Sequence, residues 1–280
     1  MAFIRPYEKR DFEATAHICR ATLPPSLASS SAAHTMAPYL WTHQYTHLSP
    51  STCFVLDDGS GTAVGYCIGC PDTTSFAAAY PSYVSAVLDA SSEVQQLRAE
   101  QADPLAPAAE AEPWTKEDGS VNGACLVQLA HDPLRLLAVE AAVAARFPAT
   151  LHIDLLEGWQ GKGWGGKLLE RTVRALGDEQ KKDAGGGVWI GVAADNAKVV
   201  PFYERMGFRL WEEEDDESHQ QPHQQDEQDY DKDKDKPQGE KSETEPGAEG
   251  GNAKRGGSIV MVREFLGGAA LRPGKLGDEE

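Results

Sequence analysis

Short apolar runs and helical spacings alternate through the first part of the chain. The segment Ala2–Tyr7 predicts a strand, and a helix is expected to begin at Asp11, with Asp11 as its cap. The apolar face of this helix comprises Phe12, Ala16, Ile18 and Cys19. A loop rich in Pro, Ser and Ala follows, and a second helix is expected over His34–His47.

Two strand-like runs come next, Cys53–Leu56 and Ala63–Ile68. The turn residues Asp57–Gly61 between them predict an antiparallel hairpin. Helical patterns then cover Thr74–Arg98, on both sides of Pro81, and Leu134–Arg146. The weakly patterned residues 99–123 between these two helical segments predict a loose surface loop.

The most regular pattern lies in the second half of the chain. It predicts a strand over Thr150–Leu156, then a glycine-rich loop and a helix that ends near Leu176. A strand over Val188–Val192, a helix over Asn196–Met206 and a strand over Phe208–Glu212 follow. Leu151, Ile153 and Leu155 share one face of the first of these strands, while His152 and Asp154 lie on the other.

Residues 213–255 contain very few large apolar side chains, and we expect this acidic, low-complexity segment to be disordered. A strand pattern, Ser258–Phe265, resumes after it, so the segment is predicted to be an insertion in a β-hairpin. The interpretation is a single domain over residues 1–280 that carries this insertion and the 99–123 loop. Histones and other basic proteins are the partner class that such an acidic insertion would attract.

Charge and composition exclude several classes of protein. The formal net charge of −18, of which −10 falls in residues 212–255, disfavours electrostatic binding to nucleic acid or to an anionic membrane. No apolar run approaches the length of a membrane span, and the first 14 residues lack the apolar core of a secretory signal. The 5 cysteines are an odd number, which argues against a disulfide framework. The sequence predicts a cytoplasmic protein, with the nucleus as the alternative compartment.

The segment Gln160–Gly166, Gln-Gly-Lys-Gly-Trp-Gly-Gly, has the chemistry of a pyrophosphate cradle. A glycine-rich turn that enters a helix lets backbone N–H groups approach an anion, and the helix dipole adds positive potential. Cationic donors lie at Lys162, Lys167 and Arg171. The spacing also matches the G-x-G-x-x-G of dinucleotide-binding domains, but the chain has a single βαβ unit and the loop follows at least four earlier elements. A nucleotide-dependent oxidoreductase is therefore the less favoured class.

Two blocks resemble the GNAT (Gcn5-related) N-acetyltransferase family. Gln160–Gly165 is similar to the Q/R-x-x-G-x-G/A signature of the family, and the second block, Asn196–Tyr203 with Met206-Gly-Phe208, is similar to N-x-x-A-x-x-F-Y-x-x-x-G-F. Val199 replaces the alanine of this pattern. The resemblance implies a mixed α/β fold, in which helices flank a central sheet that splays open to hold acetyl-CoA. It also implies transfer of the acetyl group directly to an amine in a ternary complex.

The resemblance assigns roles residue by residue. Tyr203 matches the general acid, and the backbone of Ile153 and Leu155 would pair with acetyl-CoA. The other residues that would bind this donor are Gln160, Gly161, Lys162, Gly163, Trp164, Gly165, Gly166 and Asn196. In the histone-acetylating branch a glutamate base lies six residues before the position of Leu155, which is Ala149 here. Asp154, with His152 beside it, is the alternative base.

Finer aspects of function stay open at this stage. The segments Gly65–Thr73 and Arg146–Leu156 resemble an acetyltransferase-like domain associated with O-GlcNAcase, so a catalytically weak or inactive acetyl-CoA-binding module of the same fold is the alternative to an enzyme. The acceptor is expected to be an amine, either a small molecule or a protein lysine or N-terminus. No metal is predicted, because the Cys67-x-x-Cys70 pair has no second pair at the spacing of zinc ligands.

The predicted insertion can be tested by deletion. A disordered segment contributes little buried surface, so removing residues 214–254 should leave the melting temperature within about 2 °C of that of the intact chain. Calorimetry of the two proteins measures the difference. A large fall in melting temperature would show that the segment packs against the domain.

Overall fold

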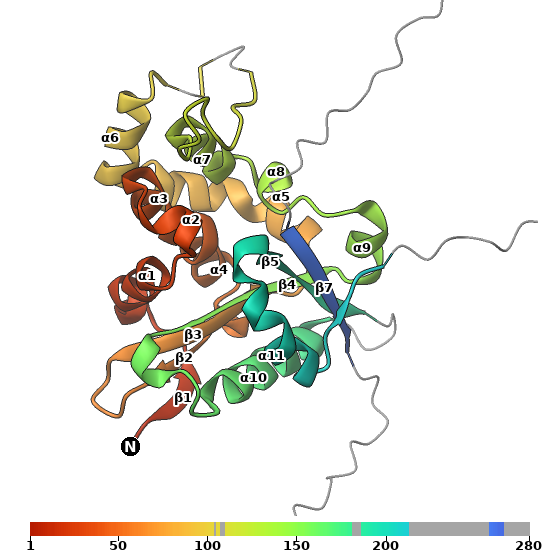
Figure 1. Ribbon diagram of the computed structural model, residues 1–280. Helices are drawn as coiled ribbons and strands as arrows, with labels where there is room; N and C mark the ends of the chain where they lie inside the picture. Colours follow the sequence, from red (N-terminus) through yellow and green to blue (C-terminus); the bar gives the residue numbers. More distant parts are fainter. Residues whose placement is uncertain (104, 107–109, 181–185, 213–257, 266–280) are drawn as a thin grey trace, which may run out of the picture. The chain divides into compact units, whose positions relative to one another are not determined.

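The computed structural model describes residues 1–103, 105–106, 110–180, 186–212 and 258–265. All of these except Glu212 belong to one compact unit (Figure 1). The expected acidic insertion lies outside the described residues. Among the helices that are described, none is long and apolar enough to cross a membrane.

Seven described strands form a single mixed sheet in the order β1-β2-β3-β4-β5-β7-β6. Their bounds are β1 Phe3–Pro6, β2 Phe54–Asp57, β3 Ala63–Cys70, β4 Ala149–Leu155, β5 Gly187–Ala193, β6 Arg209–Leu210 and β7 Ser258–Glu264. Every neighbouring pair is antiparallel except β4 and β5, which are parallel. The predicted hairpins β2–β3 and β6–β7 are confirmed, and β7 lies between β5 and β6.

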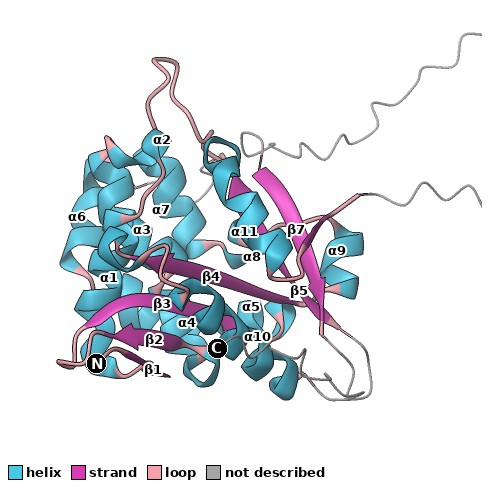
Figure 2. Ribbon diagram, turned by 60° about the horizontal axis from the view of Figure 1, so that its bottom comes forward, coloured by secondary structure: helices cyan, strands magenta, loops and turns pink. Residues whose placement is uncertain are grey.

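Helices cover both faces of this sheet (Figures 1 and 2). The α-helices are α1 Phe12–Ala21, α2 Pro25–Ala28, α3 Ser31–Trp41, α4 His43–Leu48, α5 Thr73–Tyr83, α6 Ser92–Glu100, α7 Gly123–His131, α8 Pro133–Leu136, α9 Ala141–Arg146, α10 Trp164–Glu179 and α11 Val200–Arg205. Short 3₁₀ turns are η1 Lys9–Asp11, η2 Pro50–Thr52, η4 Glu157–Trp159 and η5 Ala194–Val199, and η3 Val84–Leu88 is a π-helix.

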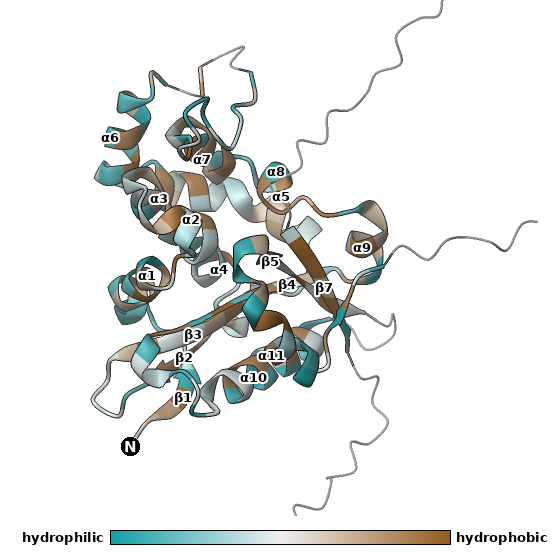
Figure 3. Ribbon diagram, viewed as in Figure 1, coloured by the Kyte–Doolittle hydropathy of each residue, from teal (hydrophilic) through white to brown (hydrophobic). Residues whose placement is uncertain are grey.

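The sheet separates two main apolar cores. On one face α10 buries Leu168, Leu169, Val173 and Leu176 against strand residues that include Leu151 and Leu155. On the other face Tyr66 and Ile68 of β3 pack against α1, α3, α4 and the helices beyond them. In Figure 3 β7 is brown, whereas α10 alternates between brown and teal, as expected for a helix with one apolar face.

Three expectations about the first half of the chain need correction. The helix predicted over His34–His47 begins at Ser31 and is broken at Thr42, where α3 ends and α4 begins. A helix that the sequence did not predict, α7, is buried along most of its length, so its apolar run shows no polar face. Asp11 precedes α1 but its side chain makes no capping hydrogen bond.

The side chain of Asp11 instead belongs to a buried ionic cluster. The Arg5 guanidinium donates to Asp11 at 2.6 and 2.8 Å and to Asp57 at 2.8 Å, and the three side chains are 9%, 2% and 1% exposed. Asp57 also accepts the N–H groups of Gly59 and Gly61. The cluster therefore fastens β1, η1 and the β2–β3 turn to one another.

The cluster makes the stability of the domain depend on pH. Burial opposes ionisation of Asp57, but the bonds from Arg5, Gly59 and Gly61 outweigh burial and lower its pKa below the ordinary value. A carboxyl with a lowered pKa in the folded state stabilises the fold fully above its unfolded pKa of about 3.9, and this contribution is lost as the pH falls through the folded value. Stability should therefore decline below about pH 4.

The substitution Arg5→Met tests the cluster. It leaves Asp11 and Asp57 buried without their cation, and such a loss costs about 3–5 kcal/mol of unfolding free energy. Arg10→Met is the matched control, because the Arg10–Glu8 pair is 60% and 53% exposed and should contribute less than about 1 kcal/mol. Urea denaturation at neutral pH measures both variants, and equal losses would contradict the assigned role of Arg5.

Candidate active site

The strands β4 and β5 pair only at the start of β4. Their register contains Ala149 opposite Val188 and Thr150 opposite Trp189, and the Thr150 hydroxyl donates to the Trp189 carbonyl at 3.0 Å. From Thr150 to Leu155, β4 stays paired with β3. Beyond Thr150, β4 therefore diverges from β5, as the resemblance to the GNAT family implied.

The divergence leaves backbone groups of β4 without a strand partner. The Leu156 N–H donates to the Val64 carbonyl of β3 at 3.0 Å. Because the backbone groups of successive strand residues point to opposite sides, the N–H and C=O groups of Leu155 and Ile153 point toward β5. The Gln160 side-chain amide donates to the Leu155 carbonyl at 2.8 Å. Within the described part of β5, no residue pairs with Ile153 or Leu155, so their N–H groups face the gap.

The glycine-rich loop leads from this gap into α10. Gly161 and Gly163 have φ of 69° and 78°, a backbone region that favours glycine, and Gly163 is the N-cap of α10. A glycine has no side chain with which to bind the first N–H groups of the helix. A Cβ at either glycine would have no heavy atom within 4 Å, so the loop surface is open to an anion.

Gly166 has a different reason to be glycine. A Cβ there would lie 3.3 Å from the Met206 sulfur, which is a tight contact, whereas one at Gly165 would lie at an ordinary 3.5 Å from the Phe202 ring. The first turn of α10 therefore packs closely against α11. This contact brings the second sequence block beside the first.

Cationic side chains surround the loop. The Lys162 ammonium lies 5.7 Å from the centre of the Trp159 ring and donates to the Gly158 carbonyl at 2.6 Å. The Lys167 ammonium lies 4.7 Å from the centre of the Trp164 ring. Both lysines are exposed and sit beside the open N-terminus of α10. Their charges and the helix dipole favour an anion in the same place.

Tyr203 lies on α11 and packs against the core that contains α10. Its ring packs edge-on against Phe202 and Phe208, with centroids 5.1 and 5.6 Å away. Burial raises the pKa of the Tyr203 phenol, and the nearby groups of Cys67 and Asp154 add to this shift. The hydroxyl therefore stays protonated across the physiological pH range and remains a proton donor.

The second block begins differently from the expectation. Asn196 lies in η5 with non-helical φ and ψ of −113° and 19°, and the helix α11 begins only at Val200. Asn196 therefore does not cap α11. Pro201 occupies the first turn of α11, where its missing N–H costs no helical hydrogen bond.

A polar network lies on the other face of β4. The Asp154 carboxylate oxygen Oδ2 accepts from the Tyr66 hydroxyl at 2.6 Å and lies 2.8 Å from His152 Nε2. The Tyr66 hydroxyl is also 3.3 Å from the hydroxyl of Thr42, at the α3–α4 break. His152 and Asp154 had been assigned to one strand face, and the structure places them there. It adds Tyr66 and Thr42, which no sequence motif indicated.

The cysteines take no part in this site. Cys67 and Cys70 point into opposite cores, and burial raises the pKa of both thiols to about 12. Both are free thiols in the structure. The described residues contain no group of three or more His, Cys, Asp or Glu side chains arranged to hold a metal ion.

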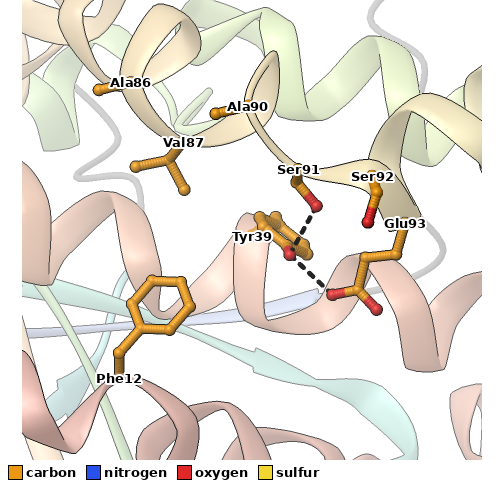
Figure 4. Close-up of a pocket in the computed structure, with 8 residues that line it drawn as sticks. All are labelled: Phe12, Tyr39, Ala86, Val87, Ala90, Ser91, Ser92 and Glu93. Atoms are coloured by element: carbon orange, nitrogen blue, oxygen red, sulfur yellow. Dashed lines mark hydrogen bonds between the residues drawn. The ribbon is translucent and has the colours of Figure 1, made fainter.

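A separate surface pocket lies among α1, α3, η3 and α6 (Figure 4). Phe12 and Tyr39 form its aromatic side, and the Tyr39 hydroxyl binds Ser91 and Glu93 at 2.8 and 2.7 Å. None of the residues predicted to bind acetyl-CoA lines this pocket. The candidate site is therefore the gap between β4 and β5 together with the glycine loop.

Comparisons with known proteins agree with this geometry. Residues 87–208 match the model of the acetyltransferase (GNAT) family. The chain is similar to the crystal structure of SsHAT, with 26% identity, a TM-score of 0.55 and coverage of 94% of this chain and 98% of that one. Weaker similarities include the ribosomal-protein-S18-alanine N-acetyltransferase from Escherichia coli (15% identity, TM-score 0.38, coverage 98% and 99%). Another is a Drosophila melanogaster polyamine N acetyltransferase (16%, 0.41, coverage 76% and 85%).

The mixed sheet and the family match together define an acyltransferase. Residues 87–208 match the GNAT acetyltransferase family, and the chain as a whole is similar in structure to SsHAT. The mostly antiparallel sheet is not the doubly wound parallel sheet of a dinucleotide-binding domain, so the oxidoreductase alternative is wrong. The link to the domain associated with O-GlcNAcase stays a prediction.

The anion-binding role of the loop can be tested at Gly163. Gly163→Glu places a negative charge and a side chain where the diphosphate of acetyl-CoA is expected, so affinity should fall at least tenfold. Isothermal titration with acetyl-CoA measures the change. The matched control is Gly119→Glu, since Gly119 has a similar φ of 81° and equally open surroundings but lies outside the site. Unchanged affinity in the Gly163 variant would move the donor site elsewhere.

Proposed function

We propose that this protein transfers the acetyl group of acetyl-CoA directly to an amine acceptor while both substrates are bound. The observation that carries the proposal is the divergence of β4 from β5 beside the open N-terminus of α10. The gap offers backbone N–H groups for a thioester, and the loop offers positive potential for a diphosphate. The family match supports acetyl-CoA as the donor.

The backbone of β4 supplies the electrostatic part of the reaction. The Leu155 N–H donates to the acetyl carbonyl oxygen, which gains negative charge when the amine attacks. A fixed donor at such a position lowers the barrier by about 3 kcal/mol. The Ile153 backbone aligns the pantetheine arm, and its side chain packs in the core beside α10. Gly161, Gly163 and Lys162 hold the diphosphate.

Tyr203 supplies the proton that the leaving group needs. As the new C–N bond forms, the C–S bond breaks and its electron pair leaves with the sulfur of CoA. The Tyr203 hydroxyl, kept protonated by its raised pKa, donates its proton to this thiolate. The ring contacts with Phe202 and Phe208 hold the hydroxyl in place.

Asp154 accepts the proton that the attacking amine loses. It is 19% exposed, lies next to Leu155 on the strand and faces away from the core that contains α10. Its charge contributes to the raised pKa of Tyr203, so the two groups are near enough to interact electrostatically. An anionic carboxylate on this side of β4 favours a cationic amine as the acceptor. The rival view, a non-catalytic acetyl-CoA-binding module, is supported by no observation in the described residues.

The substitution Tyr203→Phe tests the acid. Loss of the hydroxyl should lower kcat about a hundredfold and leave the KM for acetyl-CoA nearly unchanged, because only the transition state loses an interaction. Thiol release with a panel of amines, including spermidine, agmatine and a lysine peptide, measures the rate. Tyr80→Phe, which removes a buried hydroxyl bonded to the Ala130 carbonyl, should retain activity. An unchanged rate in the Tyr203 variant would remove it as the acid, and no turnover of any amine by the intact protein would contradict the proposed function.

A further inference from the structure

The carboxylate of Asp154 is held in one orientation by two donors on the same oxygen. Tyr66 and His152 both bind Oδ2, at 2.6 and 2.8 Å. An ionised carboxylate only accepts, so with Asp154 in that form the Nε2 atom of His152 is the donor in this pair. Oδ1 has no hydrogen-bond partner among the described residues. Oδ2 is therefore the oxygen that the protein holds, and Oδ1 is the oxygen left for another group.

The register of the sheet places Tyr66 beside Asp154. It lies directly opposite Asp154 in the β3–β4 pairing, and its side chain is 0% exposed. The burial of Tyr66 raises the pKa of its phenol well above the ordinary value, so the hydroxyl donates at every pH at which the protein is folded. The Thr42 hydroxyl, 3.3 Å away, occupies its other side.

We propose that Tyr66 is a positioning residue for acetyl transfer, which fixes Asp154 through Oδ2 so that Oδ1 faces the acceptor amine. This inference rests on the proposed function and assigns a residue outside both sequence blocks. Tyr66 touches neither substrate and acts only through Asp154.

Other titratable groups near Asp154 come from each neighbouring element. His152 lies on β4 itself, Cys67 on β3, Cys19 on α1 and Tyr203 on α11, and the shifted pKa values of the last three groups each include an electrostatic effect of Asp154. Burial keeps both thiols and the Tyr203 phenol neutral. Tyr66 and His152 are therefore the groups that hydrogen-bond the Asp154 carboxylate directly.

The substitution Tyr66→Phe keeps the ring and removes only the donor. We expect kcat to fall about tenfold, with an unchanged KM for acetyl-CoA, when both proteins are assayed with the same amine. Tyr83→Phe is the matched control, because its hydroxyl is equally buried and bonds the Tyr39 carbonyl at 2.7 Å in the helical core. This control should leave kcat unchanged.

A double-mutant cycle separates positioning from a purely structural role. In an Asp154→Asn background, Tyr66→Phe should cause no further loss of kcat, whereas additive losses would overturn the proposal. If Tyr66→Phe fails to fold, 3-fluorotyrosine at position 66 gives a stronger donor, and kcat should then change in the protein with Asp154 but not in the Asp154→Asn background. Amine turnover with no such difference overturns the role of Tyr66 alone. No turnover by the intact protein overturns the proposed function and this role together.

Discussion

The separation of β4 from β5 is the constraint on which the active site depends. Two parallel bridges, at Ala149 and Thr150, hold the strands together, and beyond them β4 follows β3 instead. Parallel strands normally bury all of their backbone groups in the ladder, so an early end to the pairing leaves donors to be satisfied by something else. In this domain, these donors belong to Ile153 and Leu155. We propose that the thioester of acetyl-CoA is their partner.

The surrounding elements make this gap usable. Gly166 lets the first turn of α10 approach Met206 at the end of α11 closely, which brings the glycine loop and α11 side by side. On the opposite face of β4, Asp154, His152 and Tyr66 form a polar network beside the helical core. The proposed base Asp154 and the proposed acid Tyr203 thus lie on different sides of one strand. The Arg5 cluster anchors the first hairpin of the same sheet.

The sequence predicted the parts of the fold that local patterns control. The hairpin at Asp57–Gly61, the strand with His152 and Asp154 on one face, and the glycine loop before α10 all follow from periodicity and turn residues. Tertiary partners were beyond such patterns. Asp11 has the sequence position of a helix cap, but its carboxylate pairs with the Arg5 guanidinium instead. The helix α7 lacks a polar face because it is buried on all sides. Tyr66 could be connected with Asp154 only through the strand register, which a single sequence does not reveal.

Amide NMR of the ¹⁵N-labelled protein during titration with acetyl-CoA tests the central claim most directly. The account predicts that the resonances of Ile153, Leu155 and the first turn of α10 shift together with one saturation curve. Because the N–H of Leu155 would gain a carbonyl acceptor, its proton should move downfield. Saturable binding that leaves Leu155 and the α10 N-terminus unchanged would show that acetyl-CoA binds elsewhere and that the splayed strands are not its site.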